Sequence, residues 1–448
     1  MNRLAGIYRI EVALPSGQSP DLASSLSPTP RFGIRHALGL TRPTTCRITG
    51  ETLQGPHFMN APLALSPRIR NTFAAPIPTA KAWAARYDGR AGPTIDLTQA
   101  VPGYPTHPDL ATRLGEGAAS AVQGRYGSID GDEILRAALA TDINRIYGGD
   151  VQAGDVAITA GANLAFTMAM TVLCGQGDQV MLPVPWYFNN AMALTMQGLE
   201  ALPLPCRAED GFIPDPDLAA TLITPRTRAI VLITPNNPTG AVYPPDLIAR
   251  FAALCAARGL WLILDESYRD FLPETAWPPH ALFTDPSWRD RIIHIYSFSK
   301  AYCVAGHRVG AIVTGQAVRT ELNKVLDTMQ ICPPRGPLPG LTWAIDHLHD
   351  WKANNRAIIA ERARVFRAGV GQLPGWRIDA LGTYFAYLRI PEHAPDALQT
   401  GEKLATEAGL LSLVGPFFGP GQERHLRLAF ANAELDAIAA VPARLMAV

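Results

Sequence analysis

Three short apolar runs, each followed directly by a polar cluster, constrain the fold of this chain most strongly. The runs span residues 229–233, 260–264 and 291–296. Continuous apolar runs rich in β-branched residues are typical of parallel strands that are buried on both faces. In an open α/β sheet, ligands bind beyond the carboxyl ends of such strands. The sequence therefore predicts an α/β fold with a mixed, mostly parallel sheet, and a site where these runs end.

The three polar clusters carry side chains that are suited to one chemistry. They contain, in chain order, Asn237, Asp265 with Tyr268, and Lys300 between Ser297 and Ser299. A lysine at the end of a buried strand is costly unless its charge is paired or removed. In a dry pocket it loses its proton and becomes a nucleophile toward aldehydes. Taken alone, Lys300 also fits a solvated serine-rich turn, but the order of the three clusters favours a shared site.

A glycine turn earlier in the chain predicts an anion site. The apolar stretch 156–160 precedes Gly161, Ala162 and Asn163, and a helical pattern follows over 164–174. Free backbone N–H groups and the helix dipole meet at such a turn and favour a phosphate. Arg308, eight positions after Lys300, supplies a charge that can hold the same dianion.

The order Asn-Pro-Thr-Gly at 237–240, Asp-x-x-Tyr at 265–268 and Ser-x-Ser-Lys at 297–300 resembles the class I/II aminotransferases. These are pyridoxal-phosphate (PLP) enzymes of fold type I, in the aspartate aminotransferase superfamily, and the resemblance extends from about Asp96 to the C-terminus. It implies an internal aldimine between PLP and Lys300, with Asp265 on the pyridinium nitrogen and Tyr268 and Asn237 on the phenolic oxygen. The implied phosphate contacts are Gly161, Ala162, Asn163, Ser297, Ser299 and Arg308. Glu266 should point away along the strand and is excluded from the site.

The resemblance also assigns residues outside these clusters. Tyr187 is expected to stack on the pyridine ring, with Trp186 as the alternative and core packing of Trp186, Tyr187 and Phe188 as a third possibility. Arg427, in an apolar frame near the C-terminus, is placed on the substrate α-carboxylate, where a guanidinium binds bidentately; a structural salt bridge is the alternative. Gly103 and Asn237 are also placed at the substrate. Tyr126 resembles the tyrosine that reaches the neighbouring subunit's phosphate, which implies a homodimer with shared active sites.

Composition and pattern divide the chain into four parts. Residues 1–75 are rich in serine, proline and arginine and are expected to be a poorly ordered extension. Residues 76–106 are expected to form an N-terminal arm, 107–325 a large PLP-binding domain, and 326–448 a smaller α+β domain that begins with a long helical pattern over 343–370. We expect Met59 to be the true start and residues 1–58 to be an upstream extension; a dispensable regulatory arm is the competing interpretation.

Charge and cysteine usage exclude several classes of protein. The chain has 39 basic and 39 acidic residues, with no basic stripe that indicates nucleic-acid binding. No run of eighteen apolar residues predicts a membrane span. The six cysteines lie far apart and show no metal-ligand spacing, so a metal site is not expected and a reducing cytoplasm fits.

These observations predict a PLP-dependent aminotransferase that acts on an L-amino acid and a 2-oxo acid in ping-pong half-reactions. The first alternative is a PLP lyase or cyclase on the same scaffold, such as a C–S β-lyase or a relative of aminocyclopropane-carboxylate synthase. A PLP-binding regulator is the second, and it requires a DNA-binding module in the N-terminal segment. The substrate pair is not specified by the motifs. Arg68 and Arg335 are candidate second cations for an acidic substrate, whereas Tyr104, Trp186 and Tyr187 favour an aromatic one.

Overall fold

The computed structural model describes residues 64–447. Most of the predicted extension, including Met59 and the segment that a DNA-binding regulator would need, lies outside the described residues. The remainder of that extension contains a short helix, α1 (Pro67–Asn71). No helix within 64–447 combines the length and apolar character needed to cross a bilayer.

Helices and strands alternate through most of the described chain. The strands are β1 (Ile95–Asp96), β2 (Val156–Thr159), β3 (Gln179–Val184), β4 (Glu200–Pro205), β5 (Thr227–Ile233), β6 (Trp261–Asp265), β7 (Ile292–Ser297), β8 (Gly310–Val313), β9 (Arg377–Gly382), β10 (Phe385–Arg389), β11 (Leu410–Leu411), β12 (Leu413–Val414) and β13 (His425–Leu428). The remaining α-helices are α2 (Pro76–Ala84), α3 (Pro108–Ala119), α4 (Glu133–Tyr147), α5 (Ala162–Leu173), α6 (Phe188–Gln197), α7 (Pro216–Leu222), α8 (Pro245–Arg258), α9 (Phe298–Ala301), α10 (Gln316–Gln330), α11 (Leu338–His347), α12 (His349–Val370), α13 (Ala397–Glu407) and α14 (Leu435–Leu445).

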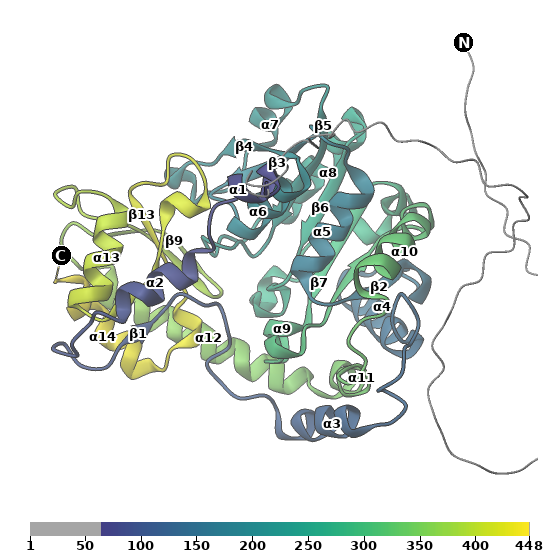
Figure 1. The fold of residues 1–448 in the computed structure, drawn as a ribbon, viewed down its shortest axis with the longest axis horizontal. Coiled ribbons are helices and arrows are strands. Elements are labelled where there is room, and N and C mark those ends of the chain that lie inside the picture. The colour runs from purple at the N-terminus through teal and green to yellow at the C-terminus, as the bar shows by residue number, and fades with distance from the viewer. Residues whose placement is uncertain (1–63, 448) are drawn as a thin grey trace, which may run out of the picture. The chain divides into compact units, whose positions relative to one another are not determined.

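A seven-stranded sheet in the order β2-β8-β7-β6-β5-β3-β4 forms the centre of the larger layered unit (Figure 1). Strands β4, β3, β5, β6 and β7 pair in parallel, whereas β8 is antiparallel to both β7 and β2. The three apolar runs of the sequence are β5, β6 and β7. The structure therefore confirms the predicted α/β class and its mixed, mostly parallel sheet.

Alternate residues of the central strands pack on opposite faces of this sheet, as the two-residue period of a strand requires. On one face, Val231, Ile263 and Ile293 pack with residues of α5, α6 and α10. On the other face, Leu232 and Leu264 pack with α8. Because both faces are covered, the polar ends of the strands are the places where this sheet can present functional side chains.

A smaller antiparallel sheet, in the order β12-β13-β10-β9, follows toward the C-terminus, as the smaller α+β part of the prediction requires. The helical pattern predicted over 343–370 is two helices rather than one. Leu348 separates α11 from α12 and adopts φ −106° and ψ 28°, outside the helical region. It is buried in the cluster that α11 forms with α3 and α4, whereas α12 continues toward β9 and α14. Packing against different partners therefore interrupts the helix.

The two sheets meet at a contact between backbones. Gly240, in the loop after β5, has a φ of 78° and lies against Gly382 at the end of β9. A Cβ at Gly240 would lie 2.3 Å from the carbonyl oxygen of Gly382, and a Cβ at Gly382 would lie 2.3 Å from that of Gly240. Side chains are excluded on both sides, so the loop that carries Asn237 is held directly against the small sheet that carries Arg427.

Candidate active site

The carboxyl ends of β5, β6 and β7 open into one cavity of about 210 Å³. Its walls include most of the residues singled out from the sequence: Ala162, Asn163, Tyr187, Asn237, Asp265, Tyr268, Ser297, Ser299, Lys300, Arg308 and Arg427. These residues come from six separate segments of the chain. The structure thus brings the three polar clusters, the glycine turn and the C-terminal arginine to one place.

Lys300 lies in the single-turn helix α9, directly after β7, and its side chain lines the cavity. Its Nζ donates a hydrogen bond to the carbonyl oxygen of Ala100. Burial, together with the positive charges of Arg427 and Arg308, lowers the pKa of Lys300 to about 8. A sizeable fraction of the amine is therefore neutral near physiological pH, as a nucleophile requires.

Asp265 ends β6 on the cavity side. Its Oδ1 accepts hydrogen bonds from the Ser267 backbone N–H at 3.0 Å and from the Ser267 hydroxyl at 2.7 Å. Burial raises the pKa of Asp265, and the two bonds from Ser267 oppose that rise. No described residue donates a hydrogen bond to Oδ2. This oxygen can therefore accept a hydrogen bond from the protonated ring nitrogen of a ligand.

The glycine turn forms a cradle at the N-terminus of α5. Gly161 has a φ of 92°, and a Cβ there would lie 2.1 Å from a terminal guanidinium nitrogen of Arg308. Arg308 itself adopts a φ of 55° and donates from Nη1 to the carbonyl of Ala305 at 2.8 Å. Because α5 is a twelve-residue helix, its first N–H groups and its dipole add to the charge of Arg308. Ser297 and Ser299 line the same end, so the cradle fits a phosphate.

Arg427 is held in β13 opposite Tyr387 of β10 and is 2% exposed. Its Nη1 donates to the Asn237 side chain at 3.0 Å, and Nη2 donates to the Thr98 carbonyl. Its Nε has no hydrogen-bond partner. Burial lowers the pKa of Arg427 to about 10. No acidic side chain of the described chain forms an ion pair with it, so this charge is available for a ligand carboxylate.

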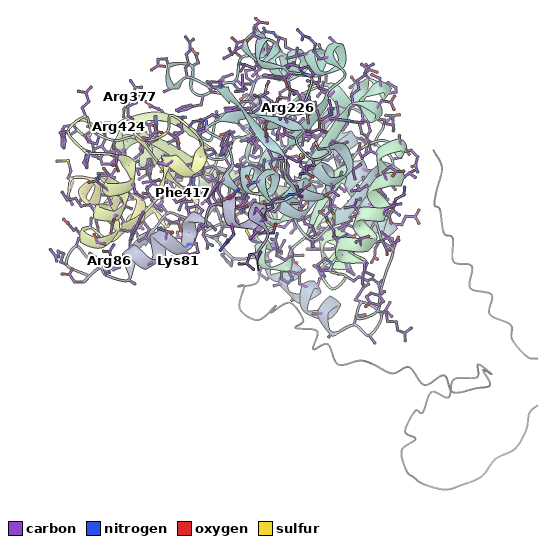
Figure 2. All side chains as sticks on the ribbon, turned by 45° about the horizontal axis from the view of Figure 1, so that its top comes forward. Lys81, Arg86, Arg226, Arg377, Phe417 and Arg424 are labelled. Carbon is purple, nitrogen blue, oxygen red and sulfur yellow. The ribbon has the colours of Figure 1, made fainter. Side chains whose placement is uncertain are left out.

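The buried guanidinium of Arg427 differs in its surroundings from that of Arg424, three positions earlier in the chain. Arg424 (Figure 2), in the turn directly before β13, donates to the backbone carbonyls of Ala394 and Pro395 at 2.6 and 3.1 Å. It lies outside the cavity and clamps a surface loop. Of the two arginines, only Arg427 lines the cavity.

Three predicted residues do not line the cavity. Gly161 lies behind it, against Arg308. Gly103 packs against the Asn432 backbone and the Arg362 guanidinium. Tyr126 is 79% exposed on a surface segment. Their predicted roles at cofactor and substrate therefore stay predictions.

The structure also places the two candidates for ring stacking, Tyr187 and Trp186, and the two candidate cations for an acidic substrate, Arg68 and Arg335. Tyr187 lines the cavity, whereas Trp186 packs beside it against Gly419. Arg68 donates to the Gln197 carbonyl, and Arg335 donates to the carbonyls of Val122 and Arg125. Neither cation lines the cavity of its own chain.

Sequence reasoning missed a wall of the cavity that comes from the N-terminal arm. Its members are Ile77, Thr98, Gln99, Ala100 and Val101, with Phe188, Ile233 and Ser267 completing the lining. The arm segment after β1 reaches the site because β1 pairs in parallel with the distant strand β11. A long-range pairing of two residues leaves no periodic pattern in the sequence.

Comparison with known proteins agrees with this geometry. The family model described as aminotransferase class I and II matches residues 93–444. An arginine–pyruvate transaminase of Pseudomonas aeruginosa is 30% identical over 68% of this chain and 77% of its own length. An aromatic aminotransferase of Arabidopsis thaliana is 28% identical over 71% of this chain and 80% of its own.

A solved aspartate aminotransferase of Thermus thermophilus with maleate has the same fold, with a TM-score of 0.78 at 23% identity. The alignment covers 86% of this chain and all of that structure. The family match spans most of the chain and includes every residue that lines the cavity except Ile77, which lies on α2. By its sequence and its fold, the chain belongs to the class I and II aminotransferase family.

Proposed function

We propose that this chain transfers an amino group between an L-amino acid and a 2-oxo acid, with pyridoxal phosphate held covalently on Lys300. The observation that supports this most directly is one cavity that combines an amine of lowered pKa, a phosphate cradle and an unpaired buried guanidinium. The relatives named above include arginine–pyruvate and aromatic aminotransferases, and transamination is the activity that their names share.

When bound, pyridoxal phosphate supplies an electron sink that stabilises negative charge at the substrate Cα. The chain's own residues then have separable tasks. Lys300 moves the proton at the substrate Cα. Asp265 holds a proton on the ring nitrogen. Arg427 binds the α-carboxylate through its planar fork, while Arg308 and the start of α5 hold the phosphate.

Tyr268 and Asn237 are proposed to donate to the phenolic oxygen of the cofactor. Tyr268 is 4% exposed, and its hydroxyl interacts with the Asn237 side chain. Burial raises the pKa of Tyr268 well above its usual value, so the hydroxyl remains a donor at neutral pH. Tyr187 is proposed to stack on the ring.

A homodimer with shared sites is part of the proposal. Tyr126 and Val122 are 79% and 63% exposed, and Ile331 of the adjoining segment is 47% exposed. Arg335 joins the two segments through its bonds to the carbonyls of Val122 and Arg125. Exposed apolar side chains gathered in this way favour contact with a second copy, and they lie on the segment whose tyrosine would reach the partner's phosphate. Gly103 is proposed to close over the substrate.

The reaction class can be tested by mixing the holoprotein with single L-amino acids and recording its absorbance. Conversion to the pyridoxamine form, with one equivalent of oxo acid released, supports transamination. Pyruvate released repeatedly from a β-substituted amino acid without an acceptor would instead support the lyase. A panel of amino acids, scored by oxo-acid formation, identifies the substrate.

Replacing Arg427 by alanine should lower kcat/KM about 100-fold or more for every amino acid, because two charge-assisted hydrogen bonds to the carboxylate are lost. Steady-state kinetics on the substrate panel measures this. Arg424→Ala, three positions earlier, is the matched control and should leave kcat/KM near the wild-type value. Equal losses in both variants would remove Arg427 from the substrate site.

The lowered pKa of Lys300 predicts a distinctive pH profile for amine labelling. In apoprotein treated with formaldehyde and a mild reductant, the Lys300 rate should rise about tenfold per pH unit below pH 8 and then level off. A lysine with the ordinary side-chain pKa should keep accelerating to about pH 10. Peptide mass spectrometry separates the two rates, and matching profiles would contradict the assignment of a neutral amine.

A further inference from the structure

Glu266 follows Asp265 at the end of β6, and the two carboxylates point to opposite sides of the strand. Asp265 lines the cavity, whereas Glu266 is fully buried on the other side, at 0% exposure. A buried carboxylate is costly unless hydrogen bonds or charges compensate it. The residues that surround Glu266 therefore need an explanation.

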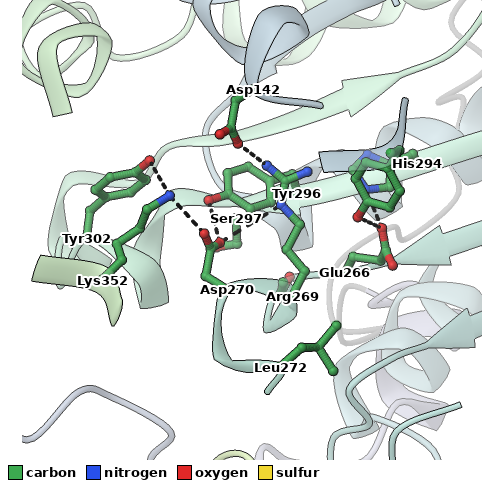
Figure 3. A network of polar contacts seen from close by, with 12 residues as sticks. Asp142, Glu266, Arg269, Asp270, Leu272, His294, Tyr296, Ser297, Tyr302 and Lys352 are labelled. Carbon is green, nitrogen blue, oxygen red and sulfur yellow. Dashed lines mark hydrogen bonds and ion pairs between the residues drawn. The ribbon is translucent and has the colours of Figure 1, made fainter. Parts of the chain in front are cut away.

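Two histidines and a tyrosine surround one oxygen of Glu266. Figure 3 shows one of the histidines, His294, beside this carboxylate. Oε2 accepts a hydrogen bond from the Tyr147 hydroxyl and lies 2.9 Å from Nε2 of His294 and 3.4 Å from Nε2 of His280. The other oxygen, Oε1, has no hydrogen-bond partner. All three of these side chains are buried. We call Glu266, Tyr147, His280 and His294 the Glu266 cluster.

The charges that face this cluster come from several elements. Tyr147 lies on α4, His294 on β7 and His280 in the loop before residue 282, while Asp265 precedes Glu266 on β6. A nearby cation is Arg269, after β6, whose guanidinium lies 5.8 Å from the Tyr147 ring centre and pairs with Asp142 at 2.7 Å. Arg269 therefore already has a carboxylate partner of its own.

The cluster keeps Glu266 ionised. Burial alone would raise the pKa of Glu266, but its contacts with His280 and His294 hold it well below its usual range. Burial lowers the pKa of His294, which favours a neutral imidazole that donates a hydrogen bond. A negative charge is thus fixed directly behind Asp265, where it opposes removal of a proton from any group that Asp265 binds.

We propose that Glu266 is a positioning residue that acts through Asp265, and that its fixed negative charge keeps the ring nitrogen of the bound cofactor protonated over a wider pH range. The inference rests on the proposed function, because it requires the ring nitrogen to lie on Asp265. A protonated ring withdraws electrons more strongly, so the cluster would sustain the electron sink at alkaline pH without touching cofactor or substrate.

The test is a pH titration of holoprotein that contains pyridoxal phosphate labelled with ¹⁵N in the ring. The ¹⁵N chemical shift reports protonation of that nitrogen directly, whether or not the enzyme turns over. In Glu266→Gln, which has the same shape without the charge, the titration should move down by about one pH unit, the scale of an interaction between neighbouring charges in a protein interior. The alkaline limb of kcat/KM should move in the same direction.

Two further variants separate charge from packing. Glu266→Asp retains the charge and should keep most of the wild-type titration. Asp270→Asn removes another buried carboxylate, one that pairs with Lys352 at 3.0 Å, and should leave the ¹⁵N titration unchanged. Equal titrations in Glu266→Gln and wild type, or equal shifts in the Gln and Asp variants, would overturn the inference.

If Glu266→Gln does not fold, the ¹⁵N titration of the wild-type holoprotein still tests the inference. A ring nitrogen that loses its proton near pH 7 in wild-type protein would overturn the inference, whereas protonation that persists above pH 9 supports it. If the labelled cofactor does not bind wild-type protein at all, the proposed function itself is wrong, and that outcome is distinct from a failure of the Glu266 inference.

Discussion

Lys300→Ala should abolish transamination, with kcat reduced by at least about 10³-fold, because the group that forms the covalent bond and moves the Cα proton is removed. The visible absorbance of the covalently held cofactor should disappear as well. Pyridoxal phosphate should still bind, because Arg308, the serines and the start of α5 remain in place. Stopped-flow half-reactions and equilibrium dialysis measure the two effects separately.

Lys324→Ala is the matched control, since Lys324 is 70% exposed and forms an ion pair with the exposed Glu321. It should retain full activity and absorbance. In wild-type protein, borohydride reduction followed by peptide mapping should place the cofactor on Lys300. A label on any other lysine, or turnover retained by Lys300→Ala, would refute the proposed function.

Arg269→Met should destabilise the protein by about 3–5 kcal/mol, which is the usual cost of removing one member of a buried ion pair. The Arg269 side chain is 0% exposed, bonds Asp142 at 2.7 Å and lies 4.1 Å above the Tyr296 ring (Figure 3). Its loss leaves buried carboxylates with fewer counter-charges. Urea-induced unfolding measures the effect as a lower midpoint.

The matched control is Arg250→Met, which breaks an exposed pair with Asp217 and should cost less than about 1 kcal/mol. Similar losses in the two variants would show that the buried network contributes nothing beyond surface pairing.

Asp270 belongs to the same network as Arg269. Burial would raise its pKa, but Lys352 and Arg269 hold it at about 2, below the ordinary value of 3.8. Because the folded-state pKa is depressed, this contribution is present above about pH 4 and is lost as the pH falls toward 2.

The sequence predicted the strands and their functional ends because both depend on local pattern. Asp265 and Lys300 follow apolar runs that are buried on both faces, and such strands must present polar groups where they end. The arm wall of Ile77 and Thr98–Val101 was not predictable, because distant contacts place it. A two-residue pairing between β1 and β11 positions Thr98–Val101, and Ile77 lies on α2, which packs against α13, β11 and β12. The break at Leu348 depends on partners of α11 and α12 that are distant in the sequence.

Other parts of the predicted site depend on information that one chain does not contain. Tyr126 is exposed in a single chain, so its predicted role requires a second copy. The roles of Gly103 and Tyr187 require a bound substrate and a bound ring. The sequence correctly placed Glu266 away from the cavity by the alternation of a strand, but the histidines around it come from residues 14 and 28 positions away and had no recognisable motif.

The six residues from Asp265 to Asp270 serve two faces of the molecule at once, since Asp265 and Tyr268 line the cavity while Glu266, Arg269 and Asp270 lie in buried ionic contacts. Laboratory evolution of a new substrate range should therefore find few tolerated changes in this stretch. Variation introduced in the arm, at the half-buried Ile77 or Val101, would reshape the same chamber without breaking a buried ionic contact, and combinatorial libraries are better placed there.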